Sequence, residues 1–319
     1  MPKVSICIPT YNTARYLPQA IESVLAQGFA DFELVICDNA STDGTPELCQ
    51  RYRDGRLRYL RFDELTNQAG NFNRCLSEAS GDLVTLLHSD DYFLPGFLDD
   101  RVSRFERDPK LGLVFGAVEV VDAGGAHVST SARWPQDRSF GAGELVEELV
   151  MACLVSPPSL MVKRSLIEKT GRFRSDLTWG HDWEWTIRLA ERGAAEYASR
   201  ALAAYRVHDA SGTAEILNAA KNGHQERLIL EETFARLTSN TALQSRRRAA
   251  YRALSRRQMY FAEQSLLADR KSVARNNLWF AVLADPTMIM KPTLWALLIA
   301  TVGPTKMYLR YVALRKGEA

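Results

Sequence analysis

The stretch DLVTLLHSDDY, residues 82–92, holds the two features that decide the fold of this chain and point to its chemistry. Its first half is an apolar run with a β-branched member, which is typical of a buried strand. The run ends in two adjacent carboxylates, Asp90 and Asp91, and a helical pattern follows Pro95 and Gly96. In an open α/β sheet, ligands bind outside the carboxyl ends of the strands. An acidic pair there can hold a divalent cation and, through it, a phosphate. A solvated turn is the alternative.

The segments around this stretch alternate between strand and helix patterns. Strand patterns cover residues 4–8, 33–37, 57–62 and 83–87, and helix patterns cover 17–28, a segment opening at 45, 69–79 and 95–107. This alternation predicts a parallel sheet with helices on both faces. The polar strand ends at residues 10–12, 38–39 and 89–91 should then meet on one edge. No G-x-G-x-x-G or Walker-type loop follows the first strand, so dinucleotide and P-loop binding are not supported.

The second half of the chain is less regular and ends in helices alone. The patterns predict a strand at 113–121, a hairpin turn at 123–126, a mobile polar loop at 129–143 and a helix at 144–154. They next predict a strand at 159–162, a helix entered through 179–185, and strands at 196–198 and 202–207. The remaining predicted elements are helices at 217–236, 243–267 and 273–283. Of Trp179, Trp183 and Trp185, at least two are expected in the core, because aromatic residues beside a helix start usually pack there.

The cysteines and the amino terminus favour a cytosolic protein. Five scattered cysteines without any CxxC spacing indicate reduced thiols and argue against a disulfide framework or a zinc site. The amino terminus lacks a basic region followed by a long apolar core, so no signal peptide is predicted. The length allows one large domain with an appendage.

The charge of the chain is unevenly distributed. From Leu243 onward it carries 14 Lys and Arg against 4 Asp and Glu, whereas the preceding residues carry 26 against 34. A basic tail on an acidic body suggests an anionic partner, either membrane lipid or nucleic acid. The apolar segment 293–302 is too short to span a bilayer. We expect the tail to lie on a membrane surface, and a helical cap on the catalytic domain or a homodimer interface is the alternative.

Short motifs occur in a fixed order between residues 3 and 212. They are SICIPTYN (5–12), LVICDNASTDGT (34–45), GD (81–82), SDD (89–91), PPS (157–159), GRF (171–173), HDW (181–183) and YRVH (205–208). Their order and spacing resemble those of the family 2 inverting glycosyltransferases of the GT-A fold, of the bacterial surface-polysaccharide type. The resemblance implies an α/β GT-A catalytic domain over residues 1–212, with a Rossmann-like, mostly parallel sheet flanked by helices. An all-α C-terminal region over 213–319 would follow.

The resemblance implies a nucleotide-sugar donor along the strand-end edge. Pro9, Tyr11 and Asn12 would line the base and ribose pocket, and Asn71 would also contact the nucleotide. Asp38 would accept a hydrogen bond from the N–H of a uracil or thymine ring, which favours a UDP- or dTDP-type donor. As an alternative, Asp38 only forms a turn.

The resemblance also assigns the metal and the base. Asp90 would contact the ribose, and Asp91 would bind Mn²⁺ or Mg²⁺ that bridges the diphosphate, with His208 as a further metal ligand. Asp182 matches the general base, which takes the proton of the attacking hydroxyl. Its alternative role is that of a helix amino-terminal residue favoured by the macrodipole.

The sequence departs from the family pattern at three places. His181 stands where many relatives carry an acidic residue. His88 stands where many relatives carry a first acidic residue, and Phe72-Asn73 stands where many carry an Arg-Asn pair, for which Arg74 is the suggested replacement. Because the pair Asp90-Asp91 is intact, we expect activity to survive.

The predicted function is metal-dependent, inverting transfer of a sugar to a hydroxyl of a glycan or lipid-linked acceptor. We expect it in the cytoplasm, at the inner face of the cytoplasmic membrane. The alternatives are a metal-dependent nucleotidyltransferase and a non-catalytic relative that binds nucleotide or glycan. Nucleic acid is not an expected partner, because the tail shows no helix-turn-helix signal and no interleaved aromatic residues.

Overall fold

The computed structural model describes residues 2–208 and 222–303. These residues divide into two compact units. The first unit holds the chain up to Leu149 together with Cys153–His208, and the second holds Val150–Ala152 and the described helices after residue 221. The predicted domain boundary between residues 212 and 213 lies outside the described residues and stays a prediction.

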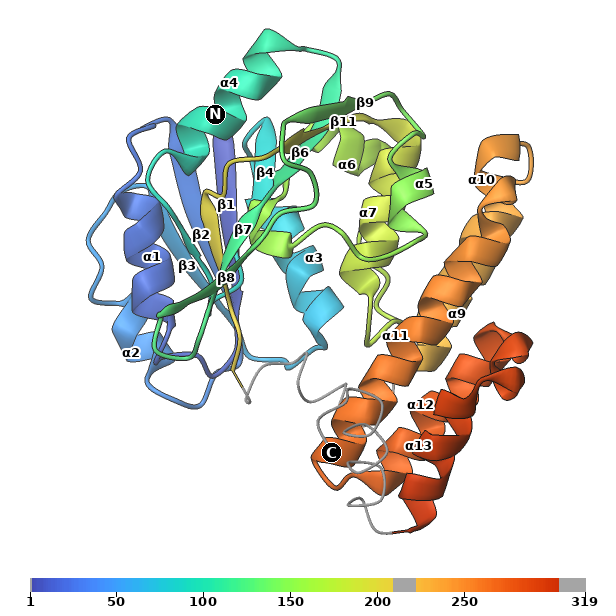
Figure 1. The fold of residues 1–319 in the computed structure, drawn as a ribbon. Helices are drawn as coiled ribbons and strands as arrows, with labels where there is room; N and C mark the ends of the chain where they lie inside the picture. The colour runs from blue at the N-terminus through green and yellow to red at the C-terminus, as the bar shows by residue number, and fades with distance from the viewer. Residues whose placement is uncertain (1, 209–221, 304–319) are drawn as a thin grey trace. The chain divides into compact units, whose positions relative to one another are not determined.

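The first unit is built on an eight-stranded sheet (Figure 1). In spatial order its strands are β3 (Leu57–Phe62), β2 (Phe32–Asn39), β1 (Val4–Thr10), β4 (Leu83–Leu86), β10 (Met161–Lys163), β6 (Leu111–Gly116), β11 (Ala194–Ala198) and β9 (Arg138–Phe140). Strands β3, β2, β1 and β4 pair in parallel, whereas β10 runs antiparallel to its neighbours β4 and β6. Every residue of β1 and β2 is buried, as their apolar runs predict. Because β1 pairs with both β2 and β4, the carboxyl ends of these three strands lie side by side.

Helices connect the strands of this sheet. They are α1 (Leu17–Leu25), α2 (Thr45–Cys49), α3 (Gln68–Glu78), α4 (Phe97–Arg107), α5 (Val146–Leu149), α6 (Arg164–Thr170) and α7 (His181–Arg192), with a 3₁₀ turn η1 (Pro157–Ser159). Helix α1 buries Leu17, Ala20, Ile21 and Val24, which recur at helical spacing on one face. The start of α3 is fixed by Asn67, whose side chain accepts a hydrogen bond from the N–H of Gly70.

A smaller, four-stranded sheet adjoins the acidic pair. Its order is β5 (Tyr92–Phe93), β12 (Ala203–Arg206), β7 (Val118–Val121) and β8 (His127–Ser131). Strand β5 begins directly after Asp91, and β12 ends at Arg206. The second sheet therefore places the YRVH motif beside the acidic pair.

Three predicted elements differ from the structure. The predicted strand at 113–121 is two strands, β6 and β7, which belong to different sheets and are separated at Ala117. The predicted loop at 129–143 contains most of β8 and all of β9, and its mostly exposed side chains gave no apolar pattern that would reveal these strands.

The third difference is the predicted helix at 144–154, which is reduced to the single turn α5. Leu145, Val146, Leu149 and Val150 are all fully buried. The apolar pattern there reflects burial of an irregular segment and not a continuous helix.

The second unit is helical. Its described helices are α9 (Asn222–Arg236), α10 (Thr241–Ser245), α11 (Arg247–Leu267), α12 (Lys271–Ala284), the 3₁₀ turn η2 (Pro286–Met290) and α13 (Pro292–Val302). Helices α11, α12 and α13 share a core that includes Leu266, Leu278, Leu294 and Leu297. The predicted helix at 217–236 is described only from residue 222 onward. Among the described helices of the chain, none has both the length and the apolar character needed to cross a membrane.

A close backbone approach at Gly81 gives a stability prediction. A Cβ at this position would lie 2.6 Å from the backbone N of Ser5 and 2.7 Å from the carbonyl C of Val4. Because backbone atoms of a central strand cannot easily move, we expect Gly81→Ala to lower the free energy of unfolding by about 1–3 kcal/mol. Urea denaturation followed by circular dichroism measures this change. Gly55→Ala is the control, since a Cβ there meets nothing within 4 Å. Equal stability of the two variants would contradict the packing described for Gly81.

Candidate functional site

The loops after β1 and β2 are joined by hydrogen bonds. The backbone N–H of Asn12 donates to Ser41 Oγ (2.9 Å), and Asn12 Oδ1 accepts from the N–H of Thr42 (2.8 Å). Asn12 adopts a left-handed backbone conformation (φ 53°) that allows this arrangement. Pro9 is buried in β1, whereas the Tyr11 ring is about half exposed at the edge of the sheet. Tyr11 and Asn12 are therefore accessible to a ligand at the strand ends.

Asp38 is fully buried at the end of β2, and both of its carboxylate oxygens have partners. Oδ1 accepts from the N–H of Ser41 (2.9 Å) and Oδ2 accepts from the hydroxyl of Tyr59 (2.6 Å). Burial and the hydrogen bond to Asp38 raise the pKa of Tyr59, so this hydroxyl remains a donor at neutral pH. Because the side chain of Asp38 is fully buried, a nucleotide base could reach it only if a neighbouring group moved. The predicted base contact of Asp38 stays a prediction.

Asn71 of α3 lies beneath the ends of β1 and β2. Its Nδ2 donates to the carbonyl oxygen of Cys37 (3.1 Å) and approaches that of Thr10 (3.5 Å). Its Oδ1 is buried without a hydrogen-bond partner in the described part of the chain. Arg74, one turn further along α3, donates to Asn39 Oδ1 (2.9 Å). Both α3 side chains thus reach the strand-end edge, where the sequence placed the nucleotide.

The acidic pair is held by β12 of the smaller sheet. The backbone N–H of Arg206 donates to Asp91 Oδ1 (2.8 Å), and Nε of Arg206 donates to the carbonyl oxygen of Asp90 (2.8 Å). The same guanidinium donates to Gln19 Oε1 of α1 (2.6 Å). His208 Nε2 lies 3.0 Å from Asp90 Oδ2. Asp90, Asp91 and His208 are therefore brought together as the sequence predicted, although their roles are not tested by this geometry.

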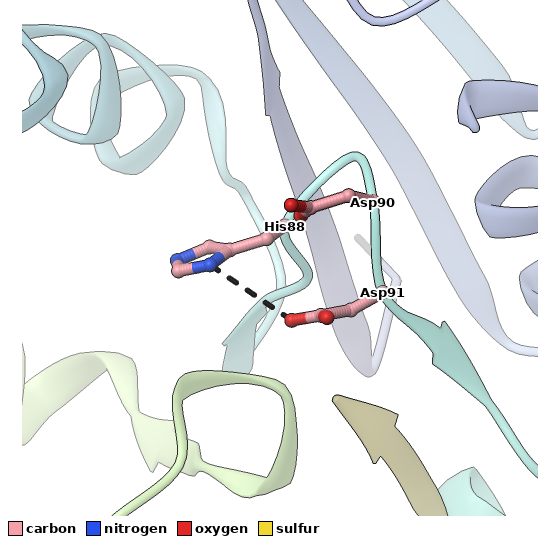
Figure 2. A group of neighbouring side chains, drawn as sticks. All are labelled: His88, Asp90 and Asp91. Atoms are coloured by element: carbon pink, nitrogen blue, oxygen red, sulfur yellow. Dashed lines mark ion pairs between the residues drawn. The ribbon is translucent and has the colours of Figure 1, made fainter. Parts of the chain in front are cut away.

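Three side chains at this point form a candidate cation site (Figure 2). One ligand atom from each of His88, Asp90 and Asp91 lies within 4.8 Å of the other two. His88 Nδ1 is 3.8 Å from Asp91 Oδ2, the contact drawn as a dashed line in Figure 2. Asp91 Oδ2 is buried and accepts no hydrogen bond within the described residues.

The electrostatics of Asp91 favour a bound cation. Burial, reinforced by the neighbouring charge of Asp90, raises the pKa of Asp91 well above its usual range. A divalent cation would offset both effects, and its preferred carboxylate ligands are present. The residues therefore fit Mn²⁺ or Mg²⁺. His88 was not among the predicted ligands, because the sequence interpretation treated it only as a lost acidic residue. The sequence feature that could have identified His88 as a ligand is its position two residues before the acidic pair.

Asp182 lies in the first turn of α7, where the helix macrodipole favours a carboxylate. Its Oδ1 accepts from the N–H of Trp183 (2.8 Å). Asp182 and His88 line the same pocket, whose other walls are mainly apolar and include Phe72, Leu160, Phe173 and Trp185. His88, whose Nδ1 lies 3.8 Å from Asp91 Oδ2, is therefore the residue shared by the acidic pair and this pocket.

Two of the three tryptophans are core residues, as predicted. Trp183 and Trp185 are 2% and 3% exposed. Trp183 Nε1 donates to the carbonyl oxygen of Leu149 (2.8 Å), and Trp185 Nε1 donates to that of Gly171 (2.9 Å). Both indole N–H groups are satisfied inside the protein, so these rings support α7 and the pocket wall.

Comparison with known proteins identifies relatives of this chain. The family model described as "Glycosyl transferase family 2" matches residues 5–170. The putative teichuronic acid biosynthesis glycosyltransferase TuaG of Bacillus subtilis is 27% identical over 231 residues, which are 69% of this chain and 85% of TuaG.

Two solved structures show the same fold. TarS 1–349 of S. aureus, in complex with UDP-GlcNAc, superposes with a TM-score of 0.59 at 17% identity, covering 90% of this chain and 92% of that one. The mannosyltransferase PcManGT of Pyrobaculum calidifontis, in complex with GDP-Man and Mn²⁺, gives 0.52 at 18% identity, covering 94% and 86%. The predicted α/β GT-A fold with a helical C-terminal extension is confirmed.

The buried charge of Asp91 leads to a prediction on cation binding. Asp91→Asn removes the charge and keeps an oxygen that can accept from the N–H of Arg206. We expect this variant to be at least as stable as the wild type without divalent cation, because an unpaired buried charge is costly. It should also lose the rise in Tm that Mn²⁺ causes in the wild type. Scanning calorimetry with and without Mn²⁺ measures both effects.

The matched control is Asp63→Asn, which changes a fully exposed carboxylate. This variant should keep the full response of Tm to Mn²⁺. A wild-type response in Asp91→Asn would show that the cation does not bind at this carboxylate.

Proposed function

The chain belongs to glycosyl transferase family 2 and is a glycosyltransferase, and we propose that it is a metal-dependent, inverting enzyme. The donor is a nucleotide-diphosphate sugar, and the acceptor is a hydroxyl of a glycan or lipid-linked molecule used in a surface polysaccharide. The observation that carries the proposal is Asp91 Oδ2 at the strand-end edge, which is buried and accepts no hydrogen bond from the described residues. The similarity to TuaG supports a polysaccharide product.

The nucleotide is proposed to bind along the ends of β1, β2 and β4. Both structural relatives described above hold a nucleotide sugar, UDP-GlcNAc in one and GDP-Man in the other. The exposed ring of Tyr11 offers a stacking surface for a base, and Asn12 and Pro9 form the adjacent wall. Asp90 is partly exposed and can accept from ribose hydroxyls. Asn71 lies at the same edge, and its buried Oδ1 accepts no hydrogen bond from the described residues. The proposed donor is of the UDP or dTDP type. This choice follows from the proposed hydrogen bond between the N–H of its base and Asp38.

The diphosphate is proposed to be held through a cation at Asp91. Bound Mn²⁺ or Mg²⁺ supplies positive charge to the diphosphate as it leaves. Arg206 fixes the orientation of Asp91 by bonding Oδ1, which leaves Oδ2 available. His208 bonds Asp90 Oδ2 and so orients that carboxylate, and its predicted role as a metal ligand stays a prediction.

Asp182 is proposed to be the general base. A hydroxyl of the acceptor placed in the pocket beside His88 can donate its proton to the Asp182 carboxylate as its oxygen attacks the anomeric carbon. Attack comes from the face opposite the diphosphate, so one displacement inverts the anomeric configuration. No covalent nucleophile of the protein is needed.

The C-terminal unit is proposed to contact the inner face of the cytoplasmic membrane. Helix α13 exposes Trp295, Ile299 and Val302, which recur at helical spacing on one face. At the carboxyl end of α13, Lys271 Nζ donates to the carbonyl oxygen of Gly303 (3.0 Å), which places a cation beside the apolar face. An apolar helix face with neighbouring cations suits an anionic lipid surface.

Catalysis is tested with a panel of nucleotide sugars, Mn²⁺ or Mg²⁺ and a crude lipid and glycan acceptor. Release of nucleoside diphosphate from one donor is the expected result, and NMR of the product should show an inverted anomeric centre. Asp182→Asn should lower kcat by about 10²–10⁴-fold and leave KM for the donor nearly unchanged, because the base acts on the acceptor.

The control for Asp182 is Asp176→Asn, which changes a largely exposed carboxylate and should keep wild-type kcat. Full transfer by Asp182→Asn would rule out this residue as the base. Release of pyrophosphate from a nucleoside triphosphate would instead identify a nucleotidyltransferase. Donor binding without turnover of any acceptor would favour a non-catalytic relative.

Membrane association is tested by sedimentation with vesicles. Replacing Trp295, Ile299 and Val302 together by Ser should weaken binding to anionic vesicles by about tenfold or more, because large apolar side chains leave the interface. The replaced side chains are exposed, so the core between α12 and α13 remains intact. Leu65→Ser/Val128→Ser, which alters exposed side chains of the first unit, should bind as the wild type does. Equal binding by the triple variant would exclude this face.

A further inference from the structure

The candidate cation site combines two kinds of ligand. Asp90 and Asp91 supply carboxylate oxygens, and His88 supplies an imidazole nitrogen. Mg²⁺ binds almost only oxygen and keeps several water ligands. Imidazole nitrogen suits transition-metal ions, whose affinity for such sites rises from Mn²⁺ to Co²⁺ and beyond. The identity of the third side chain therefore bears on which cation the site prefers.

The geometry allows the imidazole to be a direct ligand. The ligand atoms lie within 4.8 Å of one another, and His88 Nδ1 is 3.8 Å from Asp91 Oδ2. Two ligands on opposite sides of an ion with bonds of about 2.1 Å are roughly 4.2 Å apart. An ion between these atoms thus requires shifts of only a few tenths of an ångström. In Figure 2 the dashed line joins a ring nitrogen of His88 to the Asp91 carboxylate.

Two further observations describe how Asp91 and His88 are held at this point. Asp91 is 1% exposed, and its Oδ2, which faces the ring, accepts no hydrogen bond in the described part of the chain. The ring of His88 is positioned by packing, since it lies 5.3 Å from the ring of Phe72 between centroids. An imidazole held in place beside a buried carboxylate oxygen that accepts no hydrogen bond from the described residues can form a cation site with it.

We propose that His88 Nδ1 is a nitrogen ligand of the catalytic cation and makes the site select Mn²⁺ and Co²⁺ over Mg²⁺. This inference rests on the proposed metal-dependent function and adds the identity of the ligand and of the preferred ion.

The second histidine at the site has a different role. His208 Nε2 lies 3.0 Å from Asp90 Oδ2, a hydrogen-bond distance, and His208 is not part of the three-residue ligand group. An imidazole that donates to a ligand carboxylate orients that ligand. His208 is therefore a positioning residue, and His88 is the ligand.

The experiment labels the full chain with ¹⁵N-histidine and adds Mn²⁺ in the presence of UDP. Pulsed EPR should detect a hyperfine coupling between Mn²⁺ and ¹⁵N in the wild type. The coupling should disappear in His88→Asp and persist in His208→Asn. His127→Ala, which removes an exposed histidine of β8, is the control and should leave the coupling unchanged.

Calorimetric titration of the same proteins measures selectivity. The wild type should bind Mn²⁺ and Co²⁺ more tightly than Mg²⁺ by at least about tenfold, with Co²⁺ the tighter of the two. His88→Asp, which replaces nitrogen by oxygen, should lower the ratio of Mn²⁺ to Mg²⁺ affinity by about tenfold. An unchanged ratio would overturn the proposal.

The outcomes separate this inference from the proposed function. Mn²⁺ binding and sugar transfer without any ¹⁵N coupling would overturn the role of His88 and leave the glycosyltransferase mechanism intact. A coupling that survives in His88→Asp but is lost in His208→Asn would assign the nitrogen ligand to His208. Failure of Mn²⁺ to bind at all, with transfer still occurring, would overturn both the ligand and the metal dependence.

Discussion

The backbone hydrogen bond from Arg206 to Asp91 is the contact on which the site depends. Asp91 is buried next to a second carboxylate, and a loop carrying two such charges would otherwise turn toward solvent. Arg206 opposes this with its N–H on Asp91 and its guanidinium on the carbonyl oxygen of Asp90 and on Gln19 of α1. Strand β12 of the smaller sheet, which ends at Arg206, thus stabilises the acidic pair that follows β4 of the larger sheet. Neither sheet could supply this arrangement alone.

His88 connects the two halves of the site. Toward the strand ends it contacts Asp91, and toward α7 it lines the pocket that also contains Asp182. The strand-end half is polar and densely hydrogen-bonded, whereas the α7 half is walled by aromatic and aliphatic side chains such as Phe72, Phe173 and Leu160. The acidic pair thus belongs to the polar half, and Asp182 belongs to the mainly apolar half.

The strands and helices that carry a continuous apolar pattern could be predicted from the sequence. Features that depend on a single residue, or on pairing between strands distant in the sequence, could not. Strands β1, β2 and β4 followed from their apolar runs, and the meeting of their ends followed from parallel pairing. The break at Ala117 was not visible, because the buried apolar run of β6 continues through Ala117 into Val118 of β7. The partners of Asp38 were also hidden, since Tyr59 reaches it from a separate strand. His88 was missed because its importance comes from its distance to Asp91.

The hydrogen bonds between the loop after β1 and the loop after β2 have a thermodynamic consequence. Asn12 makes its hydrogen bonds to Ser41 and Thr42 without any ligand, so the chain has already lost the conformational entropy of these loops on folding. A nucleotide that docks against them meets a preorganised surface, and little of its interaction energy is consumed in ordering the protein. Donor binding against these two loops should therefore require little further ordering of the loop backbone.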